Sequence, residues 1–281
     1  MGFNERRATF RRLLAGDKVV HPASVFDPAS ARIAEDLGFE CAILAGSTAA
    51  LAVLGSPDNV TLTLSEFEGL ITRITRAAPI PLLVDADHGY GNALSVMRTV
   101  VDLERAGVSA MTIEDTDLPQ PYGVREPRLL SAEEGLGKMR AALAARSDPA
   151  LVVVGRTSAV GIAGLDEAVA RARLYSEAGV DALFFTGVST LEQVKALHAA
   201  SPLPIILGGS TLSDVAGMRA HGVRVALTGH QPIQAAFQAV YATMIAVRDG
   251  TALPPLADAR LVKVVTKAAD YDAAAKDFLG I

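Results

Sequence analysis

The segment PLLVDADHGYGNALSVMRTVVDLERAG, residues 81–107, contains the unit from which most of the chain is built. Its first part, Pro81–Asp87, is a short apolar run that predicts a buried β-strand. Its last part, Ala93–Ala106, has the apolar spacing of an amphipathic helix, and Asn92 stands where a helix N-cap is expected. The segment therefore predicts one strand–loop–helix unit.

The same unit recurs along the sequence. The predicted strands are Lys18–Phe26, Cys41–Ala45, Pro81–Asp87, Ala110–Glu114, Leu151–Arg156, Ala182–Thr186, Leu203–Leu207 and Arg224–Thr228. The predicted helices are Ser30–Leu37, Leu64–Arg76, Ala93–Ala106, Ala132–Arg146, Leu165–Ala178, Leu191–Ala200, Leu212–His221 and Tyr241–Arg248. Strands that are apolar throughout are buried on both faces, as in a parallel sheet covered by helices.

Eight such units predict an α/β fold of the (β/α)₈ TIM-type barrel class over residues 1–250. The alternative is an open doubly wound sheet, which usually has a glycine-rich dinucleotide motif after its first strand. Here that turn reads SVFDPAS, residues 24–30, and lacks the motif. Beyond the barrel, residues 251–281 predict an extra amphipathic helical tail, Asp258–Phe278, that packs on a neighbouring subunit.

Composition narrows the classes of function. The chain has 281 residues, 50% of them hydrophobic, and a net charge of -5 with acidic and basic residues interleaved. This pattern provides no basic stripe for nucleic acid or an anionic membrane. Its apolar runs are shorter than the roughly 20 residues of a transmembrane helix, and its N-terminus has no apolar signal core. A cytoplasmic enzyme acting on a small molecule is the expectation.

The single cysteine, Cys41, excludes an internal disulfide. It lies in the apolar run CAILA, so inert packing is favoured over a catalytic thiol.

Acidic residues stand at two neighbouring strand ends, where the active site of such a barrel lies. Asp85 and Asp87 are two apart and should share a face, and Glu114 ends the next strand. Carboxylates without a Cys/His cluster favour Mg²⁺ or Mn²⁺ over zinc. The alternative for Asp85 is a solvated turn residue, but three acids close together need a counter-charge.

Three further residues are candidates for binding substrate. Arg156 ends the fifth strand, where its partner is either Glu114 or a substrate carboxylate. Ser47, in AGST, can help a helix N-terminus hold an anion, or it is an ordinary cap. His230 ends the eighth strand, where its ring should reach the mouth unless it is a structural histidine. His88 is interpreted as structural, and Gly208-Gly209 is only a weak phosphate-site signal.

These segments resemble the phosphoenolpyruvate mutase/isocitrate lyase superfamily, and within it the oxaloacetate decarboxylase branch. The resemblance covers most of the chain and weakens in the tail. DADHGYGN (85–92) and TIEDT (112–116) are specific to the superfamily, and the terminal GH of VRVALTGH (223–230) indicates the decarboxylase branch.

The resemblance implies that Asp85 ligates Mg²⁺ while Asp87 and Glu114, with Asp58 as a further candidate, hold water ligands of the ion. Asp85, Arg156 and His230 would be catalytic, and Ser47, Arg156 and His230 would contact the 2-oxo dicarboxylate. The implied reaction is decarboxylation of oxaloacetate to pyruvate and CO₂ through an enolate that the metal stabilises. The resemblance also implies a homotetramer whose last helix is exchanged between subunits.

Other activities of the superfamily remain open. The loop DLPQPYG, 117–123, has neither the catalytic cysteine of isocitrate and methylisocitrate lyases nor the lysine and asparagine of the mutases and phosphonopyruvate hydrolases. Oxaloacetate hydrolase and phosphonopyruvate hydrolase are nevertheless alternatives, as is a methylisocitrate-type lyase. A barrel that binds a metal–carboxylate complex without turnover is the alternative from another class.

Overall fold

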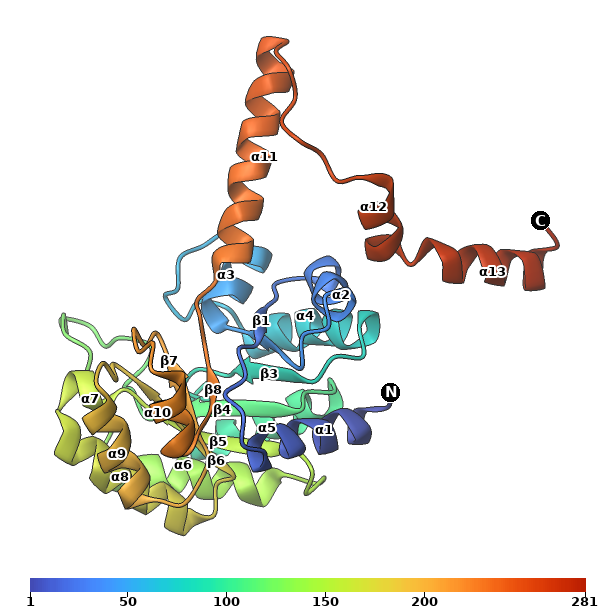
Figure 1. Ribbon diagram of the computed structural model, residues 1–281. Helices are drawn as coiled ribbons and strands as arrows, with labels where there is room; N and C mark the ends of the chain where they lie inside the picture. The colour runs from blue at the N-terminus through green and yellow to red at the C-terminus, as the bar shows by residue number, and fades with distance from the viewer.

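The computed structural model describes residues 1–281, and its centre is a sheet of eight parallel strands in sequence order. The strands curl into a barrel (Figure 1), and an isolated parallel bridge joins Val20, just before the first strand, to Val225 in the last. The strands are β1 (Ala23–Ser24), β2 (Ala42–Leu44), β3 (Leu82–Asp85), β4 (Ala110–Glu114), β5 (Val152–Thr157), β6 (Ala182–Thr186), β7 (Ile205–Gly208) and β8 (Val223–Ala226). The predicted TIM-type α/β fold is confirmed.

Thirteen helices follow or precede these strands. They are α1 (Phe3–Ala15), α2 (Pro28–Asp36), α3 (Gly46–Leu54), α4 (Leu64–Ala77), α5 (Ala93–Arg105), α6 (Ala132–Ala145), α7 (Ala159–Ile162), α8 (Leu165–Ala178), α9 (Leu191–Ala200), α10 (Val215–Ala220), α11 (Gln231–Asp249), α12 (Ala259–Thr266) and α13 (Ala268–Leu279). None of them combines the length and apolar character that a membrane crossing requires.

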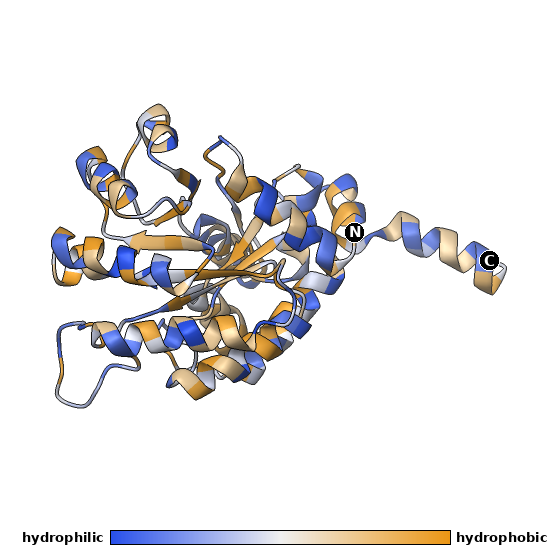
Figure 2. Ribbon diagram, turned by 90° about the horizontal axis from the view of Figure 1, so that it is seen from below, coloured by the Kyte–Doolittle hydropathy of each residue, from blue (hydrophilic) through white to orange (hydrophobic).

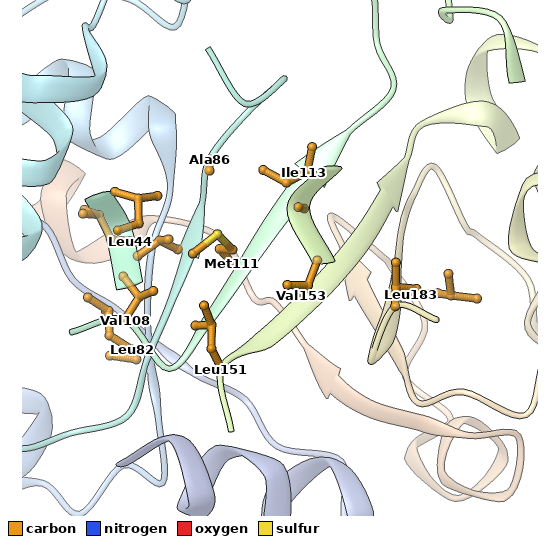
Figure 3. Packing of buried hydrophobic residues seen from close by; sticks show 14 of the residues in the cluster. Leu44, Leu82, Ala86, Val108, Met111, Ile113, Leu151, Val153 and Leu183 are labelled. Atoms are coloured by element: carbon orange, nitrogen blue, oxygen red, sulfur yellow. The ribbon is translucent and has the colours of Figure 1, made fainter. Parts of the chain in front are cut away.

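Two layers of apolar packing support the strands. Alternate residues of each strand face outward and pack beneath the helices, among them Leu82, Met111 and Val153 (Figure 3). Their neighbours, such as Leu83 and Val152, face inward and fill the barrel. Figure 2 shows the result as apolar strands at the centre with polar helix faces outside. The inward positions nearest the carboxyl ends of the strands therefore point into the barrel mouth.

Helix α1 covers the opposite end of the barrel. Phe10 and Leu14 enter the interior cluster, and the buried guanidinium of Arg7 donates to the backbone oxygens of Val108 (3.0 Å) and Glu104 (2.5 Å). This helix was not predicted, because its arginine-rich sequence gave no sign that those charges would be buried on loop carbonyls. Because α1 closes this end of the barrel, an active site is expected at the other end, where the strands have their carboxyl ends.

Helix α11 does not cover the barrel as an eighth barrel helix would. It begins well before the predicted Tyr241 and projects away from the sheet, with only Ile233 and Ala246 buried (Figure 1). The tail behind it turns back, and α12 packs on α2 of the same chain. Two of these contacts are an ion pair of 2.8 Å between Arg260 and Asp36 and a hydrogen bond from Arg32 to the Val265 oxygen. The chain alone thus leaves much of α11 exposed.

Candidate active site

A cavity of about 440 Å³ lies at the carboxyl ends of the strands. Its charged lining consists of Asp58, Asp85, Asp87, Glu114 and Arg156. The structure thus places the three predicted metal-site acids and the predicted arginine around one cavity, drawn from β3, β4, β5 and the loops that follow β3 and α3.

Asp85, the last residue of β3, is held from three directions. Thr112 on β4 donates to Oδ1 at 2.8 Å, and the backbone N–H of Asp87 donates to the same oxygen at 3.3 Å. Arg156 on β5 donates to Oδ2. The carboxylate is therefore fixed in direction and is not the solvated turn residue of the alternative interpretation.

Asp87 reaches the same cavity by a different route from the one predicted. β3 ends at Asp85, and Asp87 has a left-handed backbone with φ of 47°, so strand alternation does not set its direction. Its carboxylate lies against Gly46 at the start of α3, where an added Cβ would be 2.6 Å from Oδ1. Gly46 is thus required for this position of Asp87.

Arg156 connects the acids of two strands. In addition to Asp85, its Nη2 lies 3.4 Å from Oε1 of Glu114, and its guanidinium lies over the Phe184 ring, 5.4 Å from the centroid. Gly208 is needed here because a Cβ would lie 2.4 Å from that ring. Gly208, at the end of β7, therefore has a packing role. Of the two partners considered for Arg156, Glu114 is present in the structure.

The cavity contains more negative charge than its single guanidinium can neutralise. Four carboxylates and one arginine give a formal charge of −3 (−4 + 1). Burial raises the pKa of Asp87 and of Glu114 above the ordinary range, and the neighbouring carboxylate of Asp85 raises both further. A divalent cation in the cavity would neutralise this excess negative charge and relieve the repulsion between the carboxylates.

The donor set fits magnesium. No three acidic or histidine side chains are close enough to form a complete ligand set. Mg²⁺ prefers oxygen ligands and usually keeps several waters, with only one or two protein carboxylates in direct contact. The fixed carboxylate of Asp85, with Asp87 and Glu114 nearby, matches that requirement.

His230 lies immediately before α11 and has a defined partner. Ser24 on β1 lies 2.8 Å from Nδ1 through its Oγ. Burial lowers the pKa of His230, while the negative charges of Asp85 and Asp58 oppose that shift. His230 does not itself line the 440 Å³ cavity. Its engaged Nδ1 leaves Nε2 as the atom for a ligand.

Ser47 is also outside the lining of this cavity. It is the second residue of α3, whose N-cap residue, Ala45, has no side chain to accept from the first-turn N–H groups. The first-turn N–H groups of α3 therefore lack a side-chain acceptor. No hydrogen bond joins Ser47 to Arg156 or His230.

Other sequence interpretations concern structure rather than chemistry. Asn92 caps α5 by accepting from the Leu94 N–H at 3.0 Å. His88 is buried and does not line the cavity, and its backbone oxygen accepts from Lys138 at 2.9 Å. Cys41 is fully buried inside the barrel, and burial raises the pKa of its thiol to about 12. That environment agrees with the inert role predicted for Cys41.

Several site residues were not found from the sequence. Thr112 was discoverable, because it lies two residues before Glu114 on the same strand and must share its inward face. Ser158 was not found, and it lines the cavity beside Thr186, which donates to its Oγ at 2.9 Å. Thr186 itself was expected at the barrel mouth, because it ends the predicted sixth strand. Leu118 and Pro127 come from the loop after β4, whose path the sequence did not reveal.

Comparison with known proteins places the chain in one family. The chain matches the phosphoenolpyruvate phosphomutase family over residues 10–248. It is 51% identical over 286 residues to a protein named oxaloacetate decarboxylase from Bradyrhizobium sp. (strain ORS 278), covering 100% of this chain and 99% of that protein. A protein of the same name from Rhodopseudomonas palustris (strain BisB18) is 52% identical over 288 residues, with the same coverage.

Solved structures are similar over nearly the whole chain. Oxaloacetate acetylhydrolase in complex with 3,3-difluorooxalacetate has a TM-score of 0.86 at 30% identity, covering 98% of each chain. A phosphonopyruvate hydrolase complex with oxalate and Mg²⁺ has a TM-score of 0.83 at 28% identity, covering 99% of this chain and 100% of the other.

Proposed function

Because this chain belongs to the phosphoenolpyruvate mutase/isocitrate lyase superfamily, we propose that it is a cytoplasmic carboxy-lyase that converts oxaloacetate to pyruvate and CO₂. Relatives named oxaloacetate decarboxylase resemble it much more than the acetylhydrolase structures do. The structural observation that carries the proposal is the cavity at the strand ends, with its four carboxylates around one arginine.

The proposed cofactor is Mg²⁺, with Mn²⁺ as a substitute. Asp85 would hold the ion directly, while Asp87 and Glu114 would bind its water ligands. When bound, the ion supplies a Lewis acid for the 2-oxo group. Arg156 bridges Asp85 and Glu114 and orients both carboxylates through its two ion pairs.

The side chains around the cavity suggest how the dicarboxylate lies. Arg156 is the only cation in the lining and would face the carboxylate next to the 2-oxo group. Ser47, outside the lining at the start of α3, would approach the same carboxylate. The distal carboxylate would then meet Leu118, Pro127 and Ile162, which are apolar. Because no cation would stabilise the charged distal carboxylate there, its loss as neutral CO₂ would be favoured. His230 Nε2 would donate to the oxyanion that develops at the 2-oxo group.

A panel of 2-oxo acids assayed with Mg²⁺ tests the proposal. Oxaloacetate should give the highest kcat/KM, and oxalate, an enolate mimic, should inhibit. A protein that binds oxalate but turns over none of the acids would be a non-catalytic binder, and the proposed function would then be wrong.

Thiol-dependent lyase chemistry should be absent. The loop 117–123 has no cysteine and the only thiol is buried inside the barrel. We therefore expect no cleavage of isocitrate or methylisocitrate, and unchanged oxaloacetate turnover after iodoacetamide treatment of the folded protein. Product chromatography and residual-rate measurements check both points; efficient cleavage of either isocitrate would contradict the assignment.

We also propose a homo-oligomer, a tetramer in the implied assembly. Phe237, Val240, Tyr241, Met244 and Val247 are 49–69% exposed and recur at helical spacing on α11. A mainly apolar groove of about 510 Å³ lies beside α2, where the projecting α11 leaves the barrel uncovered. This exposed apolar area supports the proposal, because monomeric soluble proteins rarely expose large contiguous apolar patches.

The prediction is that Tyr241→Asp combined with Met244→Asp lowers the oligomeric state. Two charges on this face would have to be desolvated in the interface, so light scattering after gel filtration should show smaller species. Ala235→Asp, at an exposed position on the opposite side of the same helix, is the control and should keep the assembly. A monomeric wild-type protein at micromolar concentration would contradict the proposal.

A further inference from the structure

A second polar cluster lies behind the candidate active site, on the outer face of β4. Because strand residues alternate, Glu114 faces the cavity while Asp115, next in the chain, faces the helices. Asp115 is fully buried, and two residues of α8, Arg171 and Tyr175, are buried against it. None of the three lines the cavity, so the proposed chemistry does not use them directly.

The contacts of Arg171 join two places in the chain. Its Nη1 donates to Oδ2 of Asp115 at 2.8 Å, and its Nη2 donates to the backbone oxygen of Leu130, also at 2.8 Å. The Tyr175 hydroxyl donates to the same Asp115 oxygen at 2.6 Å. Asp115 and Leu130 are themselves joined by a backbone hydrogen bond of 2.8 Å. One guanidinium therefore holds both ends of the segment 116–129.

That segment reaches over the site. Thr116 and Leu129 form an antiparallel bridge, and beyond them Arg128 and Asp117 form an ion pair of 2.7 Å. Its tip is exposed, with the Tyr122 side chain fully in solvent. Three of its residues line the cavity: Thr116, Leu118 and Pro127.

We propose that Arg171, with Asp115 and Tyr175, is a positioning residue that fixes the base of loop 116–129 above the substrate. It acts through the loop, and it also holds the residue that follows Glu114. Its fork of donors suits this role, because it can bond a carboxylate and a carbonyl at once, whereas a lysine is a single point charge. The inference rests on the proposed function only for its kinetic part.

The test separates loop order from catalysis. Trypsin can cut after Arg125, which is exposed in the loop. We expect Arg171→Gln to be cut there about tenfold faster than the wild type and to raise the KM for oxaloacetate about tenfold. Arg171→Lys should lie between the two proteins, because it keeps the bond to Asp115 only.

Arg146→Gln is the matched control. Arg146 pairs with Asp181 at 2.5 Å and bonds the Leu151 oxygen at 2.8 Å, at the far end of α6 from the loop. Arg146→Gln should lose about as much thermal stability as Arg171→Gln. It should keep the wild-type rate of trypsin cleavage after Arg125 and the wild-type KM. If Arg171→Gln does not fold, Tyr175→Phe, which removes one hydrogen bond and keeps the ring, should show the same changes at about threefold.

The inference would be overturned if folded Arg171→Gln showed the wild-type rate of trypsin cleavage and the wild-type KM. The same result in Tyr175→Phe would overturn it if Arg171→Gln does not fold. So would faster cutting with an unchanged KM, because the loop would then not act on the substrate. If oxaloacetate proves not to be a substrate, the cutting rate still decides whether Arg171 orders the loop.

Discussion

Asp85→Ala is expected to abolish oxaloacetate turnover, with a loss of about 10³-fold or more in kcat, and complete chelation of the metal in the wild type should do the same. A metal that stabilises developing charge contributes several kcal/mol, and each 1.36 kcal/mol is a factor of ten in rate. The variant also removes the main partner of Arg156. Steady-state rates measured with and without EDTA, followed by addition of Mg²⁺ or Mn²⁺, check the prediction.

Calorimetric titration with Mg²⁺ gives an independent readout. Asp85→Ala should lose metal affinity more severely than Asp87→Ala, since Asp87 is proposed to hold water ligands only. Asp102→Ala, which removes an exposed ion pair with Arg98, is the control and should behave as the wild type. Full activity after removal of tightly bound metal would contradict the metal requirement proposed for Asp85, Asp87 and Glu114.

His230→Ala is expected to lower kcat by about 10²–10³-fold, the cost of losing one donor aimed at a developing oxyanion. Because such a contact is stronger in the transition state than in the ground state, kcat and kcat/KM should fall together. His230→Gln keeps a donor and should retain more activity. The measurements are steady-state kinetics and the Tm of each variant.

Two controls separate this role from a structural one. His21→Ala removes a histidine whose Nδ1 lies 2.9 Å from the oxygen of Ala226, the last residue of β8. His21 does not line the cavity, so this variant should leave kcat unchanged. Ser24→Ala should have a smaller effect than His230→Ala, because it removes only the group that orients Nδ1. Near-normal turnover in folded His230→Ala would remove His230 from the site.

The sequence predicted the parts of the fold that depend on local pattern. β4 and β6 occupy the predicted residues, since their apolar runs are bounded by turn residues on both sides. β1 contains only Ala23–Ser24 of the predicted Lys18–Phe26, and earlier in that run Val20 forms an isolated bridge to Val225. Tyr241–Arg248 was predicted as the eighth barrel helix, and this was wrong: α11 begins at Gln231 and projects from the barrel. Periodicity indicates that a helix has an apolar face, but not which surface covers that face.

The candidate site was predicted to a similar extent. Placing acids at strand ends correctly brought Asp85, Asp87 and Glu114 to one cavity. What the pattern lacked was long-range geometry: Ser24 meets His230 across 206 positions of the chain, and Arg171 meets Asp115 across 56. Contacts of this kind form only when the barrel closes, so no local spacing could indicate them.

Product analysis of ¹³C-labelled oxaloacetate incubated with the Mg²⁺-loaded protein tests the central claim most directly. Decarboxylation predicts pyruvate and CO₂ in equal amounts, visible by NMR, at a rate well above that of Mg²⁺ alone and absent in Asp85→Ala. Oxalate and acetate in place of pyruvate would instead identify a hydrolase built on the same cavity and would contradict the proposed reaction.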